Sequence, residues 1–250
     1  NKLTTIFYTP KLHIDQKINL DKKKNPDKNL SKLFSYFNTD KAEFYEKVDF
    51  TETSHNYGKF YEKHFKRIKN KKLNVLEIGS YRGNSSAAFL NYFKNSKIYC
   101  LDLDHKLFLF YSKRIKLVTL DYMKFSMVAK FCKKFKNFFD IIIDDGGHYK
   151  SHILTNLNNF SNCLKKKNSL YVIEDYGLKF DYLNDAKNEP SISQVIKYFS
   201  KKKIFDSKIL NKQNQIKLIN GVKNIYVYKG DWIKYGKNIS DICFLEIKNL

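Results

Sequence analysis

The chain has 250 residues, which is enough for one large α/β domain with a complete hydrophobic core, and one domain is what we expect. Its formal charge of +22 would suit an anionic substrate, but only three of its 47 basic residues are arginines, the side chain best suited to bidentate phosphate recognition. Lysine comes with abundant Asn, Ile, Phe and Tyr, a composition typical of A/T-rich genomes, so we expect mainly a solvated surface and disfavour nucleic acid as the partner.

The cysteines and the apolar segments indicate a compartment. Four cysteines lie far apart and form no Cys-x-x-Cys pair, namely Cys100, Cys132, Cys163 and Cys243. This spacing favours neither a zinc site nor a disulfide framework, and it fits a reducing compartment. No apolar run is long enough to span a bilayer and no signal-peptide core is present, although a chain that starts with Asn1 suggests that an initial stretch is missing. We expect a cytoplasmic protein without a membrane span.

The N-terminal residues are expected to form an extension and then a cover. Residues 1–36 are polar and rich in Lys and Asn, which predicts a partly flexible extension that ends in a short helix at 30–37. A second helix near 55–65 would place Tyr57 and Tyr61 near one face. Such an aromatic stripe more often packs in a core than lines a binding site.

The next segment predicts a strand, a tight turn and a helix. The apolar run at 73–79 contains Glu77 and ends at Gly79, and the loop with Ser80 and Gly83 leads into a helix at 87–93. A glycine turn at a helix N-terminus can bind a nucleotide-like ligand, because its backbone N–H groups are free. Two further strands end in acidic residues, 97–102 at Asp102 and 115–120 at Asp121, and a helix at 123–135 follows. A carboxylate at Asp102 would suit ribose hydroxyls.

The whole chain is organised around residues 140–175. The runs Ile141–Ile143 and Leu170–Ile173 have the composition of strands buried on both faces of a parallel sheet, and apolar residues at helical spacing lie between them. Both strands stop at acidic residues, so their carboxyl ends would bring together four carboxylates and one imidazole: Asp144, Asp145, His148, Glu174 and Asp175. Each pair taken alone could merely cap a helix or end a strand. Together they predict a site for a hard divalent cation, Mg²⁺ or else Mn²⁺.

The C-terminal part is predicted to complete the sheet. Residues 177–190 form a polar loop long enough to be a lid, and a helix follows at 191–200. Segments 216–219 and 224–228 flank Asn220-Gly221, which predicts a hairpin with a type I′ turn. The expected fold is therefore a Rossmann-like, doubly wound, mostly parallel sheet with an antiparallel C-terminal hairpin edge. The single domain would occupy residues 37–250, divided into a helical cover at 37–72, a cofactor and metal core at 73–176, and a lid and sheet edge at 177–250.

These motifs resemble those of a known family. The stretches LEIGSYRGNSS, CLDLD and DIIIDD look like the cofactor motifs of class I S-adenosylmethionine-dependent methyltransferases. DDGGH and the later Glu174-Asp175 pair are similar to elements of the magnesium-dependent sugar O-methyltransferases of the macrocin and mycinamicin type. Thr39-Asp40-Lys41 and His55-Asn56-Tyr57 also resemble elements that this family carries before its first strand. Gly147 and the Lys166-Lys167-Asn168 turn depart from the family pattern and leave the substrate open.

The resemblance implies a role for each matching residue. Asp145, Glu174 and Asp175 would bind the metal, with His148 as general base and Asp145 also at the reacting centre. The cofactor S-adenosyl-L-methionine would contact ten residues: Tyr57, Tyr61, Glu77, Gly79, Ser80, Gly83, Asp102, Asp121, Tyr122 and Asp144. His152 is a second, less favoured base, since it lies one helical turn after His148. The resemblance also implies a homo-oligomer.

The implied reaction transfers a methyl group to a sugar hydroxyl, which a metal acidifies and His148 deprotonates. The sugar could be free, nucleotide-linked or part of a glycan or natural product. A catechol-type O-methyltransferase is the alternative enzyme. A nucleic-acid methyltransferase is disfavoured because DDGGH replaces the Pro-Pro-aromatic element that stacks a flipped base. A carbohydrate-binding protein without catalysis would not need so many ionisable groups.

Overall fold

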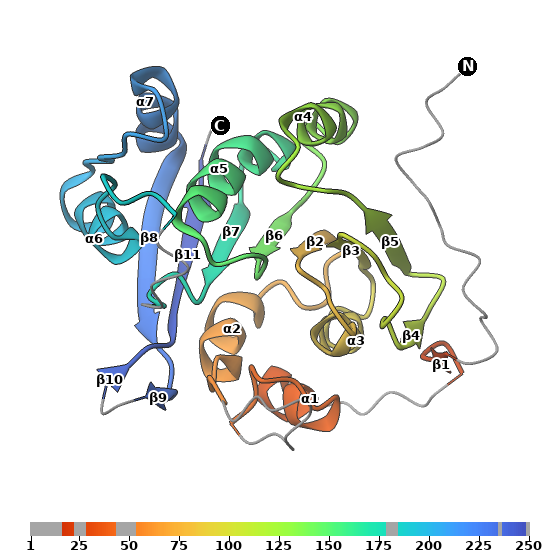
Figure 1. Cartoon of the computed structure of the whole chain (residues 1–250). Helices are drawn as coiled ribbons and strands as arrows, with labels where there is room; N and C mark the ends of the chain where they lie inside the picture. Colours follow the sequence, from red (N-terminus) through yellow and green to blue (C-terminus); the bar gives the residue numbers. More distant parts are fainter. Residues whose placement is uncertain (1–16, 23–28, 44–53, 179–184, 235–236, 249–250) are drawn as a thin grey trace.

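The fold was analysed in a computed structural model, which describes residues 17–22, 29–43, 54–178, 185–234 and 237–248. Most of the predicted extension at 1–36 and the middle of the predicted lid at 177–190 lie outside these residues. A seven-stranded sheet forms the centre, in the order β5-β3-β2-β6-β7-β11-β8 (Figure 1). Its strands are β2 (Asn74–Ile78), β3 (Lys97–Asp102), β5 (Ile115–Thr119), β6 (Ile141–Asp144), β7 (Ser169–Glu174), β8 (Val222–Lys229) and β11 (Asp241–Ile247).

The first five strands of this sheet pair in parallel, as the buried apolar runs predicted. β11 pairs antiparallel with both β7 and β8, with Ile173 opposite Cys243 and Cys243 opposite Val227. The predicted antiparallel C-terminal strands are therefore present, but the antiparallel strand lies one position inside the edge. Two small additional sheets pair β1 (Ile18–Asn19) with β4 (Phe110–Tyr111) and β9 (Ile233–Lys234) with β10 (Lys237–Asn238).

Helices cover both faces of the sheet because strand residues alternate between two cores (Figure 1). Leu76 and Ile78 of β2 pack on one face with residues of α4, α5, α6 and α7, whereas Val75 packs on the other face with residues of α1, α2 and α3. The helices are α1 (Leu30–Tyr36), α2 (Gly58–Phe65), α3 (Asn84–Tyr92), α4 (Phe125–Lys134), α5 (Lys150–Phe160), α6 (Ile192–Lys202) and α7 (Lys212–Gly221), with a 3₁₀ turn at Ser161–Cys163. This arrangement leaves the carboxyl ends of the parallel strands at one edge.

The predicted hairpin around Asn220-Gly221 is wrong. Its first arm lies inside α7, and Gly221 is the last residue of that helix before β8 begins. The Asn211 side chain accepts a hydrogen bond from the Asn214 N–H at 2.9 Å and so caps the helix. The buried Gln215 amide donates to the carbonyls of Ser207 and Leu210, each at 2.6 Å. These tertiary contacts favour the helix, which the local turn signal could not reveal.

Two broader expectations can also be compared with the structure. Within the described part of the chain, no helix combines the length and the apolar composition that crossing a bilayer requires. All four cysteines are free and buried.

Candidate active site

The loop after β2 and the loop after β6 pack against each other at the carboxyl edge of the sheet. The N–H of Asp145, directly after β6, donates to the Ile78 carbonyl at the end of β2, at 3.0 Å. Gly79 follows Ile78 with φ of +82°, and a Cβ atom there would lie 2.1 Å from the Asp145 carbonyl oxygen. Only glycine allows both this conformation and this approach. The predicted cofactor loop and the predicted metal loop are thus one packed unit.

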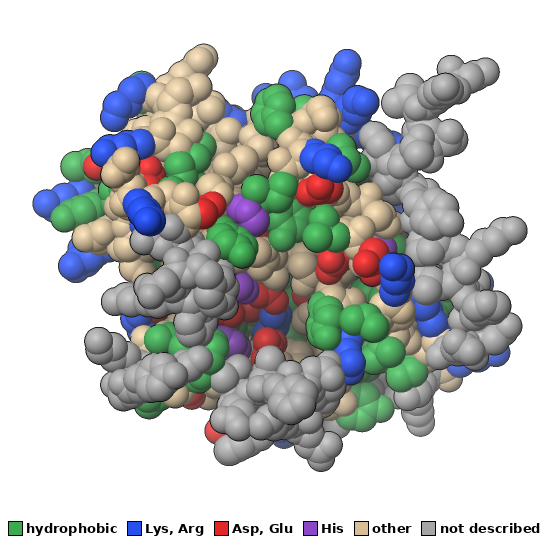
Figure 2. All heavy atoms as spheres, viewed as in Figure 1, with side chains coloured by type: hydrophobic (Ala, Val, Ile, Leu, Met, Phe, Trp, Pro, Cys, Tyr) green, Lys and Arg blue, Asp and Glu red, His purple; other side chains and the backbone are tan. Residues whose placement is uncertain are grey.

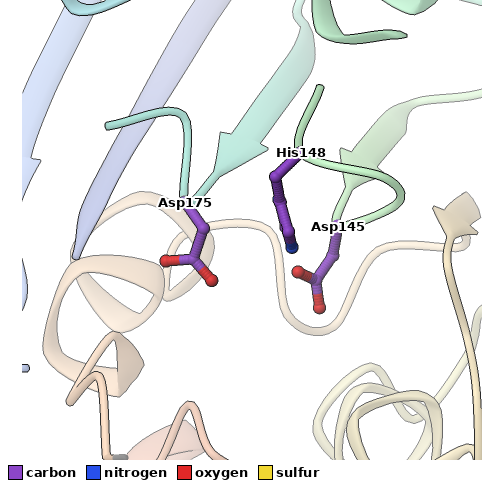
Figure 3. Close-up of side chains that lie close together, drawn as sticks. All are labelled: Asp145, His148 and Asp175. Carbon is purple, nitrogen blue, oxygen red and sulfur yellow. The ribbon is translucent and has the colours of Figure 1, made fainter. Parts of the chain in front are cut away.

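Three predicted site residues converge at this edge. Asp145 and His148 come from the loop after β6, and Asp175 comes from the end of β7, with the imidazole between the two carboxylates (Figure 3). One ligand atom from each lies within 4.8 Å of the others. Figure 2 shows Asp, Glu and His side chains gathered in a hollow of the face seen in Figure 1, with hydrophobic side chains on both sides. Of the five side chains that the strand ends were expected to bring together, these three have ligand atoms that converge.

Glu174, the remaining predicted metal ligand, lies beside the cluster and is joined to it by a lysine. The Lys41 ammonium donates to Asp145 Oδ2 and lies 2.9 Å from Glu174 Oε2. Both side chains are almost fully buried, with 3% of Lys41 and 1% of Glu174 exposed. Lys41 thus bridges carboxylates from two neighbouring strands.

The tyrosines of the helical cover contact the acidic residues directly. The Tyr57 phenol donates to Asp175 Oδ1, and the Tyr61 phenol donates to Glu174 Oε1. His55 Nδ1 lies 3.2 Å from Asp175 Oδ1. In this structure the two tyrosines therefore orient predicted metal ligands, and their assignment to the cofactor stays a prediction.

Burial and charge shift the ionisation of this cluster. Burial raises the pKa of Glu174 well above its usual value, and the neighbouring Asp145 carboxylate raises it further, while Lys41 opposes both. For Lys41, burial would lower the pKa, but Asp145 and Glu174 raise it well above the ordinary value. One buried ammonium pairs with Asp145 and Glu174, and the Asp175 carboxylate lies near Asp145 and His148. The cluster therefore favours an additional positive charge.

The residues predicted to hold the cofactor surround the loop after β2. Both oxygens of the buried Glu77 carboxylate accept hydrogen bonds from Ser85 and Ser86 at the start of α3. Asp102 accepts from the Tyr81 N–H at 2.7 Å and so holds this loop from β3. The Ser80 hydroxyl is buried, and it finds no hydrogen-bond partner among the described residues.

Other predicted cofactor residues support the neighbouring loops. Gly83 has φ of +80° and begins α3, and its ring neighbour Phe108 leaves no space for a Cβ atom. Tyr122 Oη accepts from the Gly147 N–H at 2.8 Å, while Asp121 accepts from the Met123 N–H at 3.1 Å. Their places around the site agree with cofactor roles, which stay predictions.

Asp144 makes its hydrogen bonds outside the group of Asp145, His148 and Asp175. Its carboxylate accepts from the Tyr171 phenol at 2.9 Å and from the Asn156 amide at 3.4 Å. Burial raises the pKa of Asp144 to about 6. Asp144 therefore belongs to the packing between β6, β7 and α5, rather than to the group formed by Asp145, His148 and Asp175.

The two candidate bases lie in different surroundings. His148 belongs to the acidic cluster, whereas the His152 ring packs near Tyr149 and Tyr122, with centroid distances of 4.6 and 6.0 Å. Burial lowers the pKa of His152, and its Nδ1 has no hydrogen-bond partner in the described part of the chain. The role of His148 as the base stays a prediction.

Lys41 and His55 are the site residues for which the sequence arguments assigned no role. Both belong to short polar segments before the first strand of the large sheet. The signal that could have found them was the Thr39-Asp40-Lys41 and His55-Asn56-Tyr57 resemblance. Turn composition alone does not reveal that Lys41 and His55 contact acidic residues at the ends of β6 and β7.

The fold and the site define a class of protein. Residues 76–176 match a family model described as a methyltransferase domain, and the sheet order and helical layers are those of the class I methyltransferase fold. The match to the family model is thus limited to residues 76–176, and the likeness over the rest of the chain is one of fold.

Particular relatives can then be compared. The chain is 30% identical over 128 residues to demethylmacrocin O-methyltransferase of Streptomyces fradiae, a match that covers 48% of this chain and 32% of that protein. It is 29% identical over 128 residues to mycinamicin VI 2''-O-methyltransferase of Micromonospora griseorubida, covering 48% and 31%. Matching thus extends over about a third of each of these relatives.

A solved structure has a similar fold over nearly the whole chain. The MycE methyltransferase of the mycinamycin biosynthetic pathway, in complex with Mg, SAH and mycinamycin VI, aligns with a TM-score of 0.66 at 21% identity. The alignment covers 90% of this chain and 56% of the MycE chain. At this identity the likeness concerns the fold.

Proposed function

We propose that this chain is an S-adenosylmethionine-dependent and divalent-metal-dependent O-methyltransferase that acts on a sugar hydroxyl. The observation that carries the proposal is the group of Asp145, His148 and Asp175, of which Asp145 packs directly against the glycine loop after β2. The two relatives are named demethylmacrocin O-methyltransferase and mycinamicin VI 2''-O-methyltransferase, and the similar MycE structure is described as a complex with Mg, SAH and mycinamycin VI. These names support the choice of cofactor, metal and acceptor.

The residues present fit a divalent cation. Asp145, Glu174 and Asp175 supply oxygen atoms, the donors that Mg²⁺ prefers, and Lys41 balances only one of their three charges. They also fit a bound polar cofactor, since the buried Ser80 hydroxyl in the loop after β2 has no hydrogen-bond partner in the described chain. When bound, the cation would acidify a hydroxyl and the cofactor would supply the methyl group.

The chain's own residues would position the acceptor and move its proton. Asp145 and Asp175 would fix the metal between the ends of β6 and β7, while Tyr57 keeps Asp175 oriented through its phenol. His148, between the two carboxylates, would accept the hydroxyl proton on an imidazole nitrogen. Much of the rate acceleration would come from this positioning.

A methyl-transfer assay tests the proposal. The purified chain is incubated with S-adenosylmethionine, Mg²⁺ and a set of acceptors that contains glycosylated macrolides, nucleotide sugars and a catechol, and S-adenosylhomocysteine is measured. We expect turnover with a diol-bearing sugar, none in excess chelator, and a loss of at least about 100-fold in His148→Ala with cofactor binding unchanged.

His152→Ala is the matched control, because it removes an imidazole of the same segment that lies outside the acidic cluster. It should retain most of the turnover. Equal losses in both variants would remove His148 from the mechanism, and full activity in excess chelator would remove the metal. Methylation of the catechol alone would replace the sugar as acceptor.

The compartment proposed with this function is the cytoplasm. Its support is the four free, buried cysteines, since proteins of reducing compartments rarely carry disulfides.

A further inference from the structure

Lys41 occupies an unusual place for a lysine. Its ammonium is buried between two carboxylates that come from neighbouring strands, Asp145 after β6 and Glu174 at the end of β7. A buried ammonium is costly unless it is paired, and these two ion pairs supply that compensation. The side chain reaches across 104 positions of sequence to Asp145. Its contacts are therefore a product of the fold.

The backbone around Lys41 is held so that the side chain can reach this place. The Lys41 N–H donates to Thr39 Oγ1 at 3.0 Å, and its carbonyl accepts from the N–H groups of Tyr57 and Gly58 at 2.9 and 3.2 Å. The Asp40 carbonyl accepts from the His55 N–H at 2.7 Å. Two segments of the helical cover thus clamp each other and aim the ammonium at the strand ends.

The Lys41 ammonium contacts the Glu174 oxygen that would otherwise be available to a metal. Glu174 Oε1 accepts from Tyr61 and Oε2 lies 2.9 Å from Lys41 Nζ, so both oxygens have partners. The three residues whose ligand atoms already converge are instead Asp145, His148 and Asp175. A divalent ion placed among these carboxylates would also be repelled by the ammonium beside them.

From this geometry we infer that Lys41 is an internal cation that competes with the divalent metal for Glu174 and Asp145, and that it thereby sets the metal affinity of the site. The inference rests on the proposed function, since it concerns the same metal. In the metal-free chain the ammonium neutralises the buried carboxylates and keeps them in place. When the metal enters, Glu174 exchanges the ammonium for the ion.

Metal binding to substituted proteins tests the inference. Lys41→Met removes the charge and keeps a similar side-chain length, and Mg²⁺ affinity is measured by calorimetric titration of the metal alone. We expect Lys41→Met to bind Mg²⁺ at least about tenfold more tightly than the natural chain, because the repulsion is gone. Without Mg²⁺ its unfolding temperature should fall, and saturating Mg²⁺ should restore it.

Lys59→Met is the matched control. Lys59 lies on α2 in the same cover and pairs with Asp231 at 3.2 Å, but both side chains are about half exposed, at 47% and 54%. The Lys59→Met substitution also removes one positive charge, but it leaves the contacts of the buried carboxylates unchanged. Its Mg²⁺ affinity should equal that of the natural chain.

The outcomes separate this inference from the proposed function. If the natural chain binds Mg²⁺ and Lys41→Met binds it equally well or more weakly, the inference is overturned while the metal site stands. If neither protein binds Mg²⁺, the metal part of the proposed function fails together with the inference.

A second measurement does not depend on the variant's folding. In crystals of the natural chain grown with Mg²⁺, the ion should contact Glu174, and Lys41 Nζ should lie farther than the present 2.9 Å from Oε2. An ion bound beside an unchanged Lys41–Glu174 pair would overturn the inference. A Lys41→Gln variant, which keeps an N–H donor, serves the titration if Lys41→Met does not fold.

Discussion

At the scale of single residues, Glu77 shows how a predicted ligand can have a structural task. Its carboxylate is completely buried, and its two oxygens accept from the first hydroxyls of α3, Ser85 and Ser86. Burial raises the pKa of Glu77 from 4.5 to about 7, although Lys41 and both serines oppose this shift. The ionised form is therefore disfavoured in the folded chain relative to the unfolded chain.

This raised pKa predicts a pH-dependent stability. The folded state binds the Glu77 proton more tightly, so the contribution of this group to stability is complete below its unfolded pKa and is lost as the pH rises through about 7. Relative to Glu77→Gln, the natural chain should lose about 2 kcal/mol of unfolding free energy between about pH 5 and about pH 8. Urea unfolding of both proteins measures this. Parallel pH curves would contradict the prediction.

At the scale of elements, α2 connects the helical cover to the ends of the sheet strands. Tyr61 packs edge-on against Phe34 of α1, Phe89 of α3 and Phe244 of β11, at centroid distances of 5.8, 5.3 and 5.3 Å. Its phenol continues past this aromatic core to Glu174. One side chain thus belongs both to the hydrophobic core and to the site, so packing and site geometry are linked.

Removal of this phenol should destabilise the chain. Tyr61→Phe keeps the ring contacts but leaves the buried Glu174 carboxylate with one hydrogen bond fewer, which should cost about 1–3 kcal/mol of unfolding free energy. Denaturant titration measures the loss. Tyr228→Phe is the control, since the half-buried Tyr228 phenol meets His64 Nε2 at 3.0 Å on the same cover and contacts no site residue. Equal effects of the two substitutions would contradict this role of Tyr61.

Alternate side chains of each central strand pack into the two hydrophobic cores on opposite faces of the sheet. Ile142 and Ile143 are neighbours in β6, yet one packs under α5 and the other under the α1–α3 layer. Apolar β-branched residues at both positions are the reason why the run could be recognised as a strand buried on both faces. The C-terminal segment at 216–221 lacked such a run, and its helix depends on Asn211 and Gln215 instead.

At the scale of the whole molecule, the excess of positive charge is the dominant feature. The chain has 47 basic and 25 acidic residues. Several acidic residues are buried and do not offset the positive charge of the surface, among them Glu77, Asp144 and Glu174. Like charges on the surface repel one another and oppose compaction.

Added salt should therefore stabilise the chain. Raising NaCl from about 0.02 M to about 0.5 M shortens the screening length several-fold and weakens the repulsion among surface lysines, so the unfolding temperature should rise. Differential scanning calorimetry measures it. KCl at the same ionic strength should give the same increase, because screening does not depend on the cation. A constant or falling unfolding temperature would show that net repulsion is not important.

The sequence by itself determined the main elements and where their ends meet. Continuous apolar runs fix buried parallel strands, and such strands place Asp145, His148, Glu174 and Asp175 at one edge, whatever the details of packing. The same reading of apolar runs placed Gly79 and Asp102 at the ends of two neighbouring strands.

Only the tertiary structure decided how these residues are used. It placed Lys41 between Asp145 and Glu174, and it paired Tyr57 with Asp175 and Tyr61 with Glu174. It also paired Glu77 with Ser85 and Asp144 with Tyr171, and it made a helix of the predicted hairpin arm. The physical reason is that spacing within an element depends on neighbours along the chain. The partner of a buried charge depends instead on groups that packing brings from far away, such as Asp145 for Lys41 across 104 positions.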